Sequence, residues 1–333
     1  MKSIPIEIQN TFKRAYTIDP SLLIPYGGGQ EGSDGVVFRF QGEKAGDLLK
    51  ILHLGTGNTH FAELHFTARI KFLAFLNQSG VPTMKLIPAL DGLLYQRLDA
   101  PSGCWVAYAM KKVVGKTMSP NIWDPDLIQN WGRTIGKLHQ ATQSYPEWHD
   151  CVDPESGESF LTWESEWQSF YDMCEDAEVC YRLKNIKAIF DALPVRRDCF
   201  GFIHNDPHLW NLRINNSQVI LLDFDVANHH WFITDIAISI SSQHILNKHS
   251  GGFYNPVKNR EFLVDFFKAF IFGYDQENDL DHTWLTHLDT FIAYRRILLY
   301  LLSYNWRKSN PDLQKSWKEM IVVQPEILGK IDL

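Results

Sequence analysis

The chain has 333 residues, of which 45% are hydrophobic and 21% are charged. This length and composition are typical of a globular protein with two lobes or domains and exclude a mainly disordered chain. The formal net charge of −7, from 39 acidic and 32 basic side chains, argues against a nucleic-acid partner, whose phosphates would need a basic surface.

The first third of the chain begins with a glycine-rich segment from Tyr26 to Gly35, which has five glycines in nine residues. Backbone amides of such a segment can surround phosphates, and Gly28 and Gly29 are the candidates for this role. The segment lacks the Gly-Lys-Ser/Thr ending of a Walker A loop, and an ordinary glycine-rich turn is the alternative. We interpret it as a nucleotide lid.

Strand and helix patterns follow in order. Two β-rich runs, 36–40 and 47–52, flank a polar turn and predict a hairpin. Residues 60–78 change to helical spacing, with apolar side chains three and four residues apart at Phe61, Leu64, Ala68, Phe72 and Phe75. Short strand-like runs return at 93–98 and 104–110. The first third therefore predicts a small antiparallel sheet with one helix.

Beyond Gly115 the chain becomes mainly helical. One predicted helix carries Ile128, Trp131, Ile135 and Leu138 on a single face, and another carries the apolar residues of 262–271. The acidic stretch from Trp163 to Glu178 is expected to be a solvated helix face, which is the usual role of a charge run. The alternative is a wall that attracts an ammonium-bearing substrate.

Cysteines and apolar segments indicate the compartment. The five cysteines are scattered, odd in number and without a Cys-x-x-Cys pair, so neither a disulfide framework nor a zinc ribbon is predicted. The N-terminus carries an early acid, Glu7, and no apolar core of signal-peptide length. The late apolar segment 291–306 is short and contains Arg295 and Arg296. We expect a cytoplasmic protein without a membrane partner.

The segment 203–225 sets carboxylate and amide side chains at spacings that phosphoryl transfer uses. Asp206 and Asn211 are five residues apart, so one loop can direct both at a phosphate group. Asp206 would orient or deprotonate the substrate hydroxyl, and Asn211 would offer its carbonyl oxygen to Mg²⁺. The apolar run 218–222 predicts a buried strand that returns Asp223, the main magnesium ligand, to this loop.

Two alternatives apply to this segment. One is an accidental cluster of polar loop residues, and the other is a metal site built from His204, Asp206 and His208. A metal hydrolase would need further nitrogen and oxygen ligands from other motifs. The pair His229-His230 has no spaced carboxylate beside it, so the sequence favours a kinase.

The segment resembles the aminoglycoside phosphotransferase and choline kinase family, whose loop reads His-Gly-Asp-x-His-x-x-Asn and precedes a strand ending in Asp-Phe-Asp or a close variant. The matching residues here are His204, Asp206, His208, Asn211 and then Asp223-Phe224-Asp225. Asn205 stands where the family has glycine, and asparagine tolerates left-handed backbone geometry better than most other residues. The resemblance makes Asp225 a second metal ligand or a metal-shell acid, and makes Asp235 a support of the loop.

The resemblance covers most of the chain and implies an α+β, bilobal protein-kinase-like fold. The small N-terminal lobe, residues 1–110, would hold a sheet and one main helix and bind the nucleotide. The larger, mainly helical lobe, residues 111–333, would carry the catalytic and substrate sites. The helix around Trp131 to His139 resembles a family helix whose histidine is interior.

The kinase plan also requires a lysine for the ATP phosphates and an acid to hold it. Lys50 lies in the second β-rich run, and Glu63, on the following helix, is its expected partner; an exposed helix charge is the alternative for Glu63. The resemblance places the junction of the lobes at 108–111, so backbone groups of Ala109 and Met110 would hydrogen-bond adenine.

These features predict an enzyme, an ATP- and Mg²⁺-dependent kinase that transfers the γ-phosphoryl group to a hydroxyl of a small molecule. Candidate acceptors are an aminoglycoside, a choline-like alcohol, homoserine or a sugar. The late helix 294–300 resembles that of homoserine-kinase-like members, and Arg295 or Arg296 facing the cleft would suit an anionic acceptor. The alternative function is a catalytically silent nucleotide-binding or structural member of the same fold.

Overall fold

The computed structural model describes residues 4–16, 18, 23–28, 35–40, 46–118, 123–249, 256–304 and 310–323. The chain divides into two units, Met1–Val114 and Gly115–Leu333. The division falls at the end of the region where the sequence turns from strand-like to helical. Assignment of nucleotide binding to the first unit and catalysis to the second stays a prediction.

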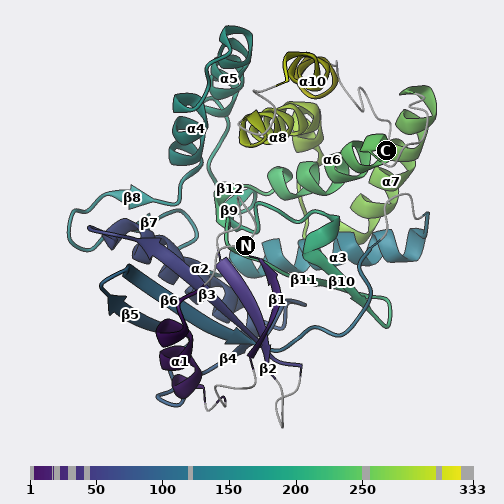
Figure 1. Cartoon of the computed structure of the whole chain (residues 1–333). Coiled ribbons are helices and arrows are strands. Elements are labelled where there is room, and N and C mark those ends of the chain that lie inside the picture. Colours follow the sequence, from purple (N-terminus) through teal and green to yellow (C-terminus); the bar gives the residue numbers. More distant parts are fainter. Residues whose placement is uncertain are drawn as a thin grey trace. The chain divides into compact units, whose positions relative to one another are not determined.

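The N-terminal unit is built around one antiparallel sheet (Figure 1). Its elements are α1 (Ile6–Ala15), β1 (Leu23–Gly28), β2 (Gly35–Phe40), β3 (Leu48–Gly55), α2 (His60–Gln78), β4 (Leu86–Ile87), β5 (Gln96–Ala100) and β6 (Gly103–Met110). The strand order is β1-β2-β3-β6-β4, and β5 also pairs with β6. The predicted hairpin is confirmed, because β2 and β3 pair with Val36 opposite Ile51.

The two helices of this unit cover opposite faces of the sheet. Leu49 and Ile51 of β3 belong to the same buried cluster as Ile8 and Phe12 of α1. Side chains alternate between faces along a strand, so Lys50 lies on the other face. Its cross-strand neighbour there is Tyr108, whose ring lies 6.0 Å from that of Phe66 on α2. Helix α1 was not among the predicted elements.

The predicted helix at 60–78 is confirmed by α2, but its predicted apolar stripe is only partly right. Ala68 and Phe72 are buried, whereas Phe61 is 45% exposed. The inner face also includes Phe66 and Leu73, which are seven residues, or about two helical turns, apart and were not in the predicted stripe. Strand β5 begins at Gln96, three residues later than the run at 93–98 suggests.

The C-terminal unit is mainly helical. Its helices are α3 (Pro125–Thr142), α4 (Trp163–Asp172), α5 (Ala177–Phe190), α6 (Ile233–His249), α7 (Pro256–Tyr274), α8 (Leu288–Leu302) and α10 (Pro311–Trp317). Shorter helical turns are η2 (Leu209–Asn211), η3 (His282–His287) and η4 (Lys318–Val323). Three antiparallel pairs join β7 (Cys151–Val152) with β8 (Ser159–Phe160), β9 (Phe200–Ile203) with β12 (Asn228–Trp231), and β10 (Leu212–Asn215) with β11 (Gln218–Leu221). The predicted α+β fold class is confirmed.

Helices α3 and α7 pack with their backbones in close contact. A Cβ atom added at Gly132 would lie 1.9 Å from the carbonyl oxygen of Phe270, and one added at Gly273 would lie 2.0 Å from that of Gln129. The indole of Trp131 meets the ring of Phe270 edge-on at 5.8 Å. Glycine is required at these crossings because any side chain would push the two helices apart.

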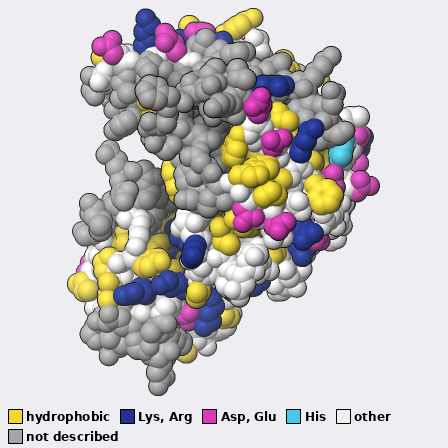
Figure 2. Space-filling model, turned by 90° about the vertical axis from the view of Figure 1, so that its right-hand side faces the viewer, with side chains coloured by type: hydrophobic (Ala, Val, Ile, Leu, Met, Phe, Trp, Pro, Cys, Tyr) yellow, Lys and Arg dark blue, Asp and Glu magenta, His cyan; other side chains and the backbone are white. Residues whose placement is uncertain are grey.

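Charged side chains of both signs border hydrophobic ones on the face shown in Figure 2. Such mixing is typical of a solvated surface. Within the ranges given above, no helix has both the length and the apolar character needed to cross a membrane.

Candidate active site

The predicted catalytic loop, residues 204–211, begins where β9 ends at Ile203, and Asp235 at the start of α6 fixes its backbone. The carboxylate of Asp235 accepts hydrogen bonds from the backbone N–H groups of His204 and Asn205, at 3.0 and 2.8 Å. It also lies 3.2 Å from Nε2 of His139, which is fully buried and stacks on Phe232. These contacts confirm that Asp235 supports the loop and that His139 is a satisfied interior histidine.

Asn205, which replaces the family's glycine, has a left-handed backbone with φ of 62°. Asparagine accepts this conformation at lower cost than most residues. Its side chain is also used, because Nδ2 donates to Oε2 of Glu166 at 2.5 Å and to the carbonyl of Val226 at 3.2 Å. The substitution therefore keeps the loop geometry and adds a connection from the loop to helix α4.

Asp206 presents its carboxylate to three donors. Arg295 Nη2 binds Oδ1 in an ion pair, while Nδ2 of Asn211 and Nε2 of His208 lie 3.1 and 3.3 Å from Oδ2. Burial would raise the pKa of Asp206, but Arg295 and then His208 outweigh it and lower the pKa to about 2. Asp206 is therefore ionised at neutral pH, which is the form that can orient a hydroxyl and accept its proton.

Asn211 and Asp223 are brought together by backbone contacts around Leu222. The N–H of Leu222 donates to the carbonyl of Asn211 at 2.8 Å, and Nε2 of His204 lies 2.8 Å from the carbonyl of Leu222. Asp223 follows directly, with a left-handed φ of 59°. The β10–β11 hairpin thus returns the chain to the loop at the place where the sequence predicts.

The oxygen atoms of this group fit Mg²⁺ chemically. Asn211 donates with Nδ2 to both the backbone and the side chain of Asp206, which directs its amide oxygen elsewhere. Asp223 and Asp225 are half-buried. An amide oxygen and two carboxylates are the hard donors that Mg²⁺ takes alongside nucleotide phosphates and water. The metal roles of Asn211, Asp223 and Asp225 stay predictions.

The histidine-rich alternative disagrees with the contacts of the rings. In His204, Nε2 faces the carbonyl of Leu222 and Nδ1 accepts from the N–H of Asp206 at 3.3 Å. In His208, Nδ1 accepts from the N–H of Trp210 at 3.1 Å. Over the described ranges, no group of three His, Cys, Asp or Glu side chains has metal-binding geometry. These histidines shape the loop.

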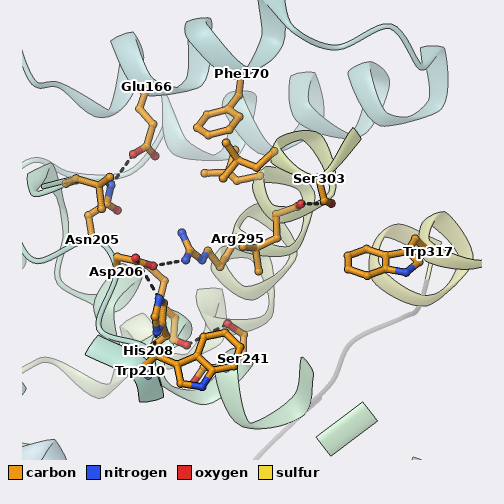
Figure 3. A pocket seen from close by; sticks show the side chains of 16 residues that line it. Glu166, Phe170, Asn205, Asp206, His208, Trp210, Ser241, Arg295, Ser303 and Trp317 are labelled. Atoms are coloured by element: carbon orange, nitrogen blue, oxygen red, sulfur yellow. Dashed lines mark hydrogen bonds and ion pairs between the residues drawn. The ribbon is translucent and has the colours of Figure 1, made fainter. Parts of the chain in front are cut away.

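A cavity of about 590 Å³ opens beside Asp206 within the C-terminal unit (Figure 3). The charged groups that line it are Asp206, Arg295 and Glu166. Most of the remaining wall is apolar and includes Phe170, Trp210, Ile238, Leu298, Leu299, Leu302 and Trp317. A volume and lining of this kind suit a small organic molecule oriented by a few polar contacts.

Glu166 corrects the expectation that the acidic stretch is only a solvated face. Glu164 and other residues of α4 are exposed, as expected, but Glu166 faces the cavity. Its Oε1 accepts from the hydroxyl of Tyr294 at 3.1 Å, and its Oε2 accepts from Asn205. Burial raises the pKa of Glu166, against the opposing effects of Asn205, Tyr294 and Arg295.

Glu166 and Tyr294 were not predicted as site residues. The available signal was the helical spacing of Trp163, Glu166 and Phe170, which places a carboxylate on the inner side of α4 beside a buried tryptophan. Arg295 was one of two arginines considered. The structure distinguishes them, since Arg295 lines the cavity and Arg296 is buried at 3% exposure.

The last described segment closes one side of the cavity. Trp317 at the end of α10 lines it, and the next residue, Lys318, binds the carboxylates of Asp176 and Glu178 at 2.7 and 2.9 Å. Arg182 also donates to the carbonyl of Val322 at 3.1 Å. Charged contacts to α5 therefore hold this segment in place.

In the N-terminal unit, Lys50 lies in strand β3 and Glu63 in the following helix α2, as predicted. Lys50 is buried and lies on the face of the sheet that α2 covers. Glu63, in the first turn of α2, forms an ion pair of 3.0 Å with Arg97, which also binds Asp99 at 2.9 Å. Arg97 is thus a partner of Glu63 that was not expected, and the contact between Glu63 and Lys50 stays a prediction.

Four further residues are predicted to contact the nucleotide, and the structure describes three of them, Gly28, Ala109 and Met110. Gly28 has φ of 73°, and a Cβ there would lie 2.2 Å from the carbonyl of Gly35, so a side chain would be excluded. Gly29 lies outside the described residues. Ala109 and Met110 each pair with β3 on one side and β4 on the other. The adenine contacts of Ala109 and Met110, and the phosphate contacts of the glycines, stay predictions.

The chain is similar in sequence to known phosphotransferases. A family model described as "Phosphotransferase enzyme family" matches residues 22–278. The chain is also 24% identical to the amicoumacin kinase of Bacillus subtilis (strain 168) over 282 residues, which is 82% of this chain and 78% of that protein.

The fold is similar to those of solved small-molecule kinases. An amicoumacin kinase in complex with AMP-PNP, Ca²⁺ and Ami has a TM-score of 0.81 at 22% identity, covering 98% of this chain and 95% of that one. A microcompartment-associated aminopropanol kinase has a TM-score of 0.64 at 18% identity, covering 94% and 93%. A spectinomycin phosphotransferase has a TM-score of 0.57 at 17% identity, covering 98% and 96%. These likenesses confirm the predicted kinase-like fold.

Proposed function

The chain belongs to the phosphotransferase enzyme family, and on that premise we propose that it phosphorylates a hydroxyl of a largely apolar small molecule bound beside Asp206. Family membership confirms the predicted reaction class, a small-molecule kinase that uses ATP and a divalent metal. The acceptor, the roles of individual residues and the location are our proposals.

The observation that carries the proposed acceptor class is the lining of the cavity. Aromatic and leucine side chains form most of its wall, and its charged groups gather at one end around Asp206. A molecule with many ammonium groups would leave most of them against apolar surface, which is costly. The cavity favours an acceptor with an aromatic or aliphatic body and a polar end that carries the hydroxyl. Amicoumacin, for which two similar kinases are named, is the first candidate.

Asp206 is the proposed base. Its carboxylate is ionised, lies at the cavity wall and would orient the acceptor hydroxyl and accept its proton as the oxygen attacks the γ-phosphorus. Asn211, Asp223 and Asp225 would hold Mg²⁺, which neutralises charge on the ATP phosphates. Lys50 would bind the α- and β-phosphates. The presence of Asp206, Asn211 and Asp223 together argues against the catalytically silent alternative, in which such groups are usually lost.

We also propose a cytoplasmic location. The five cysteines, all of which the structure describes, form no disulfide with one another, as is usual where thiols are kept reduced. ATP and Mg²⁺ are available in that compartment.

Acceptor-dependent ADP formation tests the proposal. The panel would contain amicoumacin, spectinomycin, aminopropanol, choline and homoserine, with the phosphorylated product identified by mass spectrometry. Of these compounds we expect turnover with amicoumacin. We expect Asp206→Asn to lower kcat by about 10²- to 10⁴-fold while the protein stays folded. Arg196→Met, on an exposed ion pair, is the control. A folded Asp206→Asn variant with full turnover would exclude Asp206 as the base.

A further inference from the structure

Among the described residues that line the cavity, Arg295 is the one cation. We propose that Arg295 determines acceptor specificity: while it stays paired with Asp206, its remaining N–H donors bind a carbonyl oxygen next to the reactive hydroxyl. The acceptor class is then a hydroxy-carbonyl compound, such as a hydroxy amide with an apolar body. This inference rests on the proposed function, because it concerns the same cavity.

The first argument is the unused hydrogen-bonding capacity of Arg295. Its side chain is only 14% exposed, and a guanidinium carries five N–H donors. Among the residues that the structure describes, Asp206 is its one hydrogen-bond acceptor. Donors that face an apolar cavity without an acceptor are costly. An acceptor oxygen from the substrate would satisfy them.

The second argument is the position of Arg295 relative to the base. Arg295 reaches from α8 to Oδ1 of Asp206, as Figure 3 shows. The other carboxylate oxygen, Oδ2, already faces Asn211 and His208. A hydroxyl that reaches Asp206 therefore arrives beside the guanidinium. A carbonyl one or two bonds away from that hydroxyl would meet the free N–H groups, since the planar guanidinium can bind two oxygens at once.

The third argument concerns charge and favours a neutral carbonyl. A carboxylate on the acceptor would lie close to the carboxylates of Asp206 and Glu166, and like charges at that range repel. An ammonium group next to the hydroxyl would instead lie close to the positive charge of Arg295, which repels it. A neutral carbonyl takes the donors of Arg295 without either conflict.

Helix α8 fixes the arrangement through two consecutive residues. Tyr294 binds Glu166, and Arg295 binds Asp206. Because α8 is anchored at both points, the guanidinium is held in one orientation before the acceptor arrives, which reduces the entropy lost on binding. This is the property expected of a residue that selects among acceptors.

Three small hydroxy compounds with the same benzyl body separate the possibilities. N-benzyl-2-hydroxypropanamide has the neighbouring carbonyl, 1-benzyloxypropan-2-ol lacks it and is neutral, and 1-benzylaminopropan-2-ol carries an ammonium group instead. For the wild-type protein we expect kcat/KM to be about 10- to 100-fold higher for the amide than for the ether, as for a hydrogen bond to a charged group. Equal values, or a preference for the amine, would overturn the inference.

Variants of Arg295 attribute the preference to this side chain. Arg295→Met should bring the amide-to-ether ratio close to one, whatever its effect on overall turnover, and Arg295→Lys should give an intermediate ratio because it keeps the charge without the planar fork. Arg196→Met, the matched control, should keep the wild-type ratio. If Arg295→Met lowers kcat/KM for both compounds equally, Arg295 acts only on Asp206 and the inference is wrong.

Calorimetric binding of the amide and the ether, in the presence of Mg²⁺ and AMP-PNP, separates this inference from the proposed function. If the wild-type protein phosphorylates nothing but binds the amide at least tenfold more tightly, and Arg295→Met abolishes the difference, the proposed function fails and the inference about Arg295 stands. If turnover occurs without a difference in binding or in kcat/KM, the inference fails and the proposed function stands.

Discussion

The backbone of Asn205 provides a quantitative test of the catalytic loop. Both Asn205→Gly and Asn205→Ala remove the hydrogen bonds to Glu166 and to the carbonyl of Val226. These two losses are worth about 1 kcal/mol each. The variants differ in the backbone, since φ is 62° and a left-handed residue with a Cβ costs about 1–2 kcal/mol.

The backbone cost of alanine is partly offset by the greater freedom that glycine gains in the unfolded chain, about 0.5–1 kcal/mol. We therefore expect Asn205→Gly to lose about 2–3 kcal/mol in free energy of unfolding and Asn205→Ala about 1 kcal/mol more. Urea titrations measure the difference as a shift of roughly 0.3 M between the two midpoints. Asn216, with φ of 47° in the exposed β10–β11 turn, gives the control pair, which should show the backbone difference alone.

An Asn205→Ala variant as stable as Asn205→Gly would refute the argument that backbone geometry selects this residue. A difference at Asn205 but none at Asn216 would instead mean that contacts of the added Cβ at Asn205, and not the left-handed φ, distinguish the two variants, because both variants lack the same two hydrogen bonds.

Three further changes test other parts of the structure. Gly132→Ala places a Cβ against the carbonyl of Phe270 and should lower the free energy of unfolding, measured by thermal unfolding, by about 1–3 kcal/mol. Gly27→Ala, where a Cβ meets open space, is the control and should not show this loss. Burial lowers the pKa of His230 to about 3, below its unfolded value near 6.5, so the free energy of unfolding should fall by about 1.6 kcal/mol from pH 6.5 to pH 5. His230→Phe should remove that part of the pH slope in urea titrations. Trp317→Ala removes one cavity wall and should raise the acceptor KM roughly tenfold with kcat retained; a change in kcat alone would contradict its place at the wall.

Local sequence patterns predicted the elements whose determinants are local. Helix α2 has the predicted limits, because its apolar periodicity begins and ends within the segment. The turn before β11 was predicted from Asn216 and Ser217, which both adopt positive φ there. The support of the loop by Asp235 was also predicted, since the family motif places that residue at a fixed distance along the chain.

The contacts that could not be predicted join residues far apart in sequence. Arg295 lies 89 residues after Asp206, and the rotation of α8 decides whether Arg295 or Arg296 enters the cavity. Glu166 lies 39 residues before Asn205 and looked like one of several surface acids. Such pairings depend on how helices pack against each other, and a single sequence with its helical periodicity does not specify that.

The hydrogen bonds of Glu166 have a consequence for how the two ligands affect each other's affinity. Glu166 connects the wall of the cavity to Asn205 in the loop, and the same loop carries Asn211. If an acceptor that presses on this wall makes the loop bind Mg²⁺ and nucleotide more tightly, then Mg²⁺ and nucleotide must tighten acceptor binding by the same factor. Affinities measured for either ligand alone would then underestimate those in the ternary complex. Replacing Glu166 would reduce the enhancement of nucleotide binding by the acceptor and the enhancement of acceptor binding by the nucleotide by the same factor.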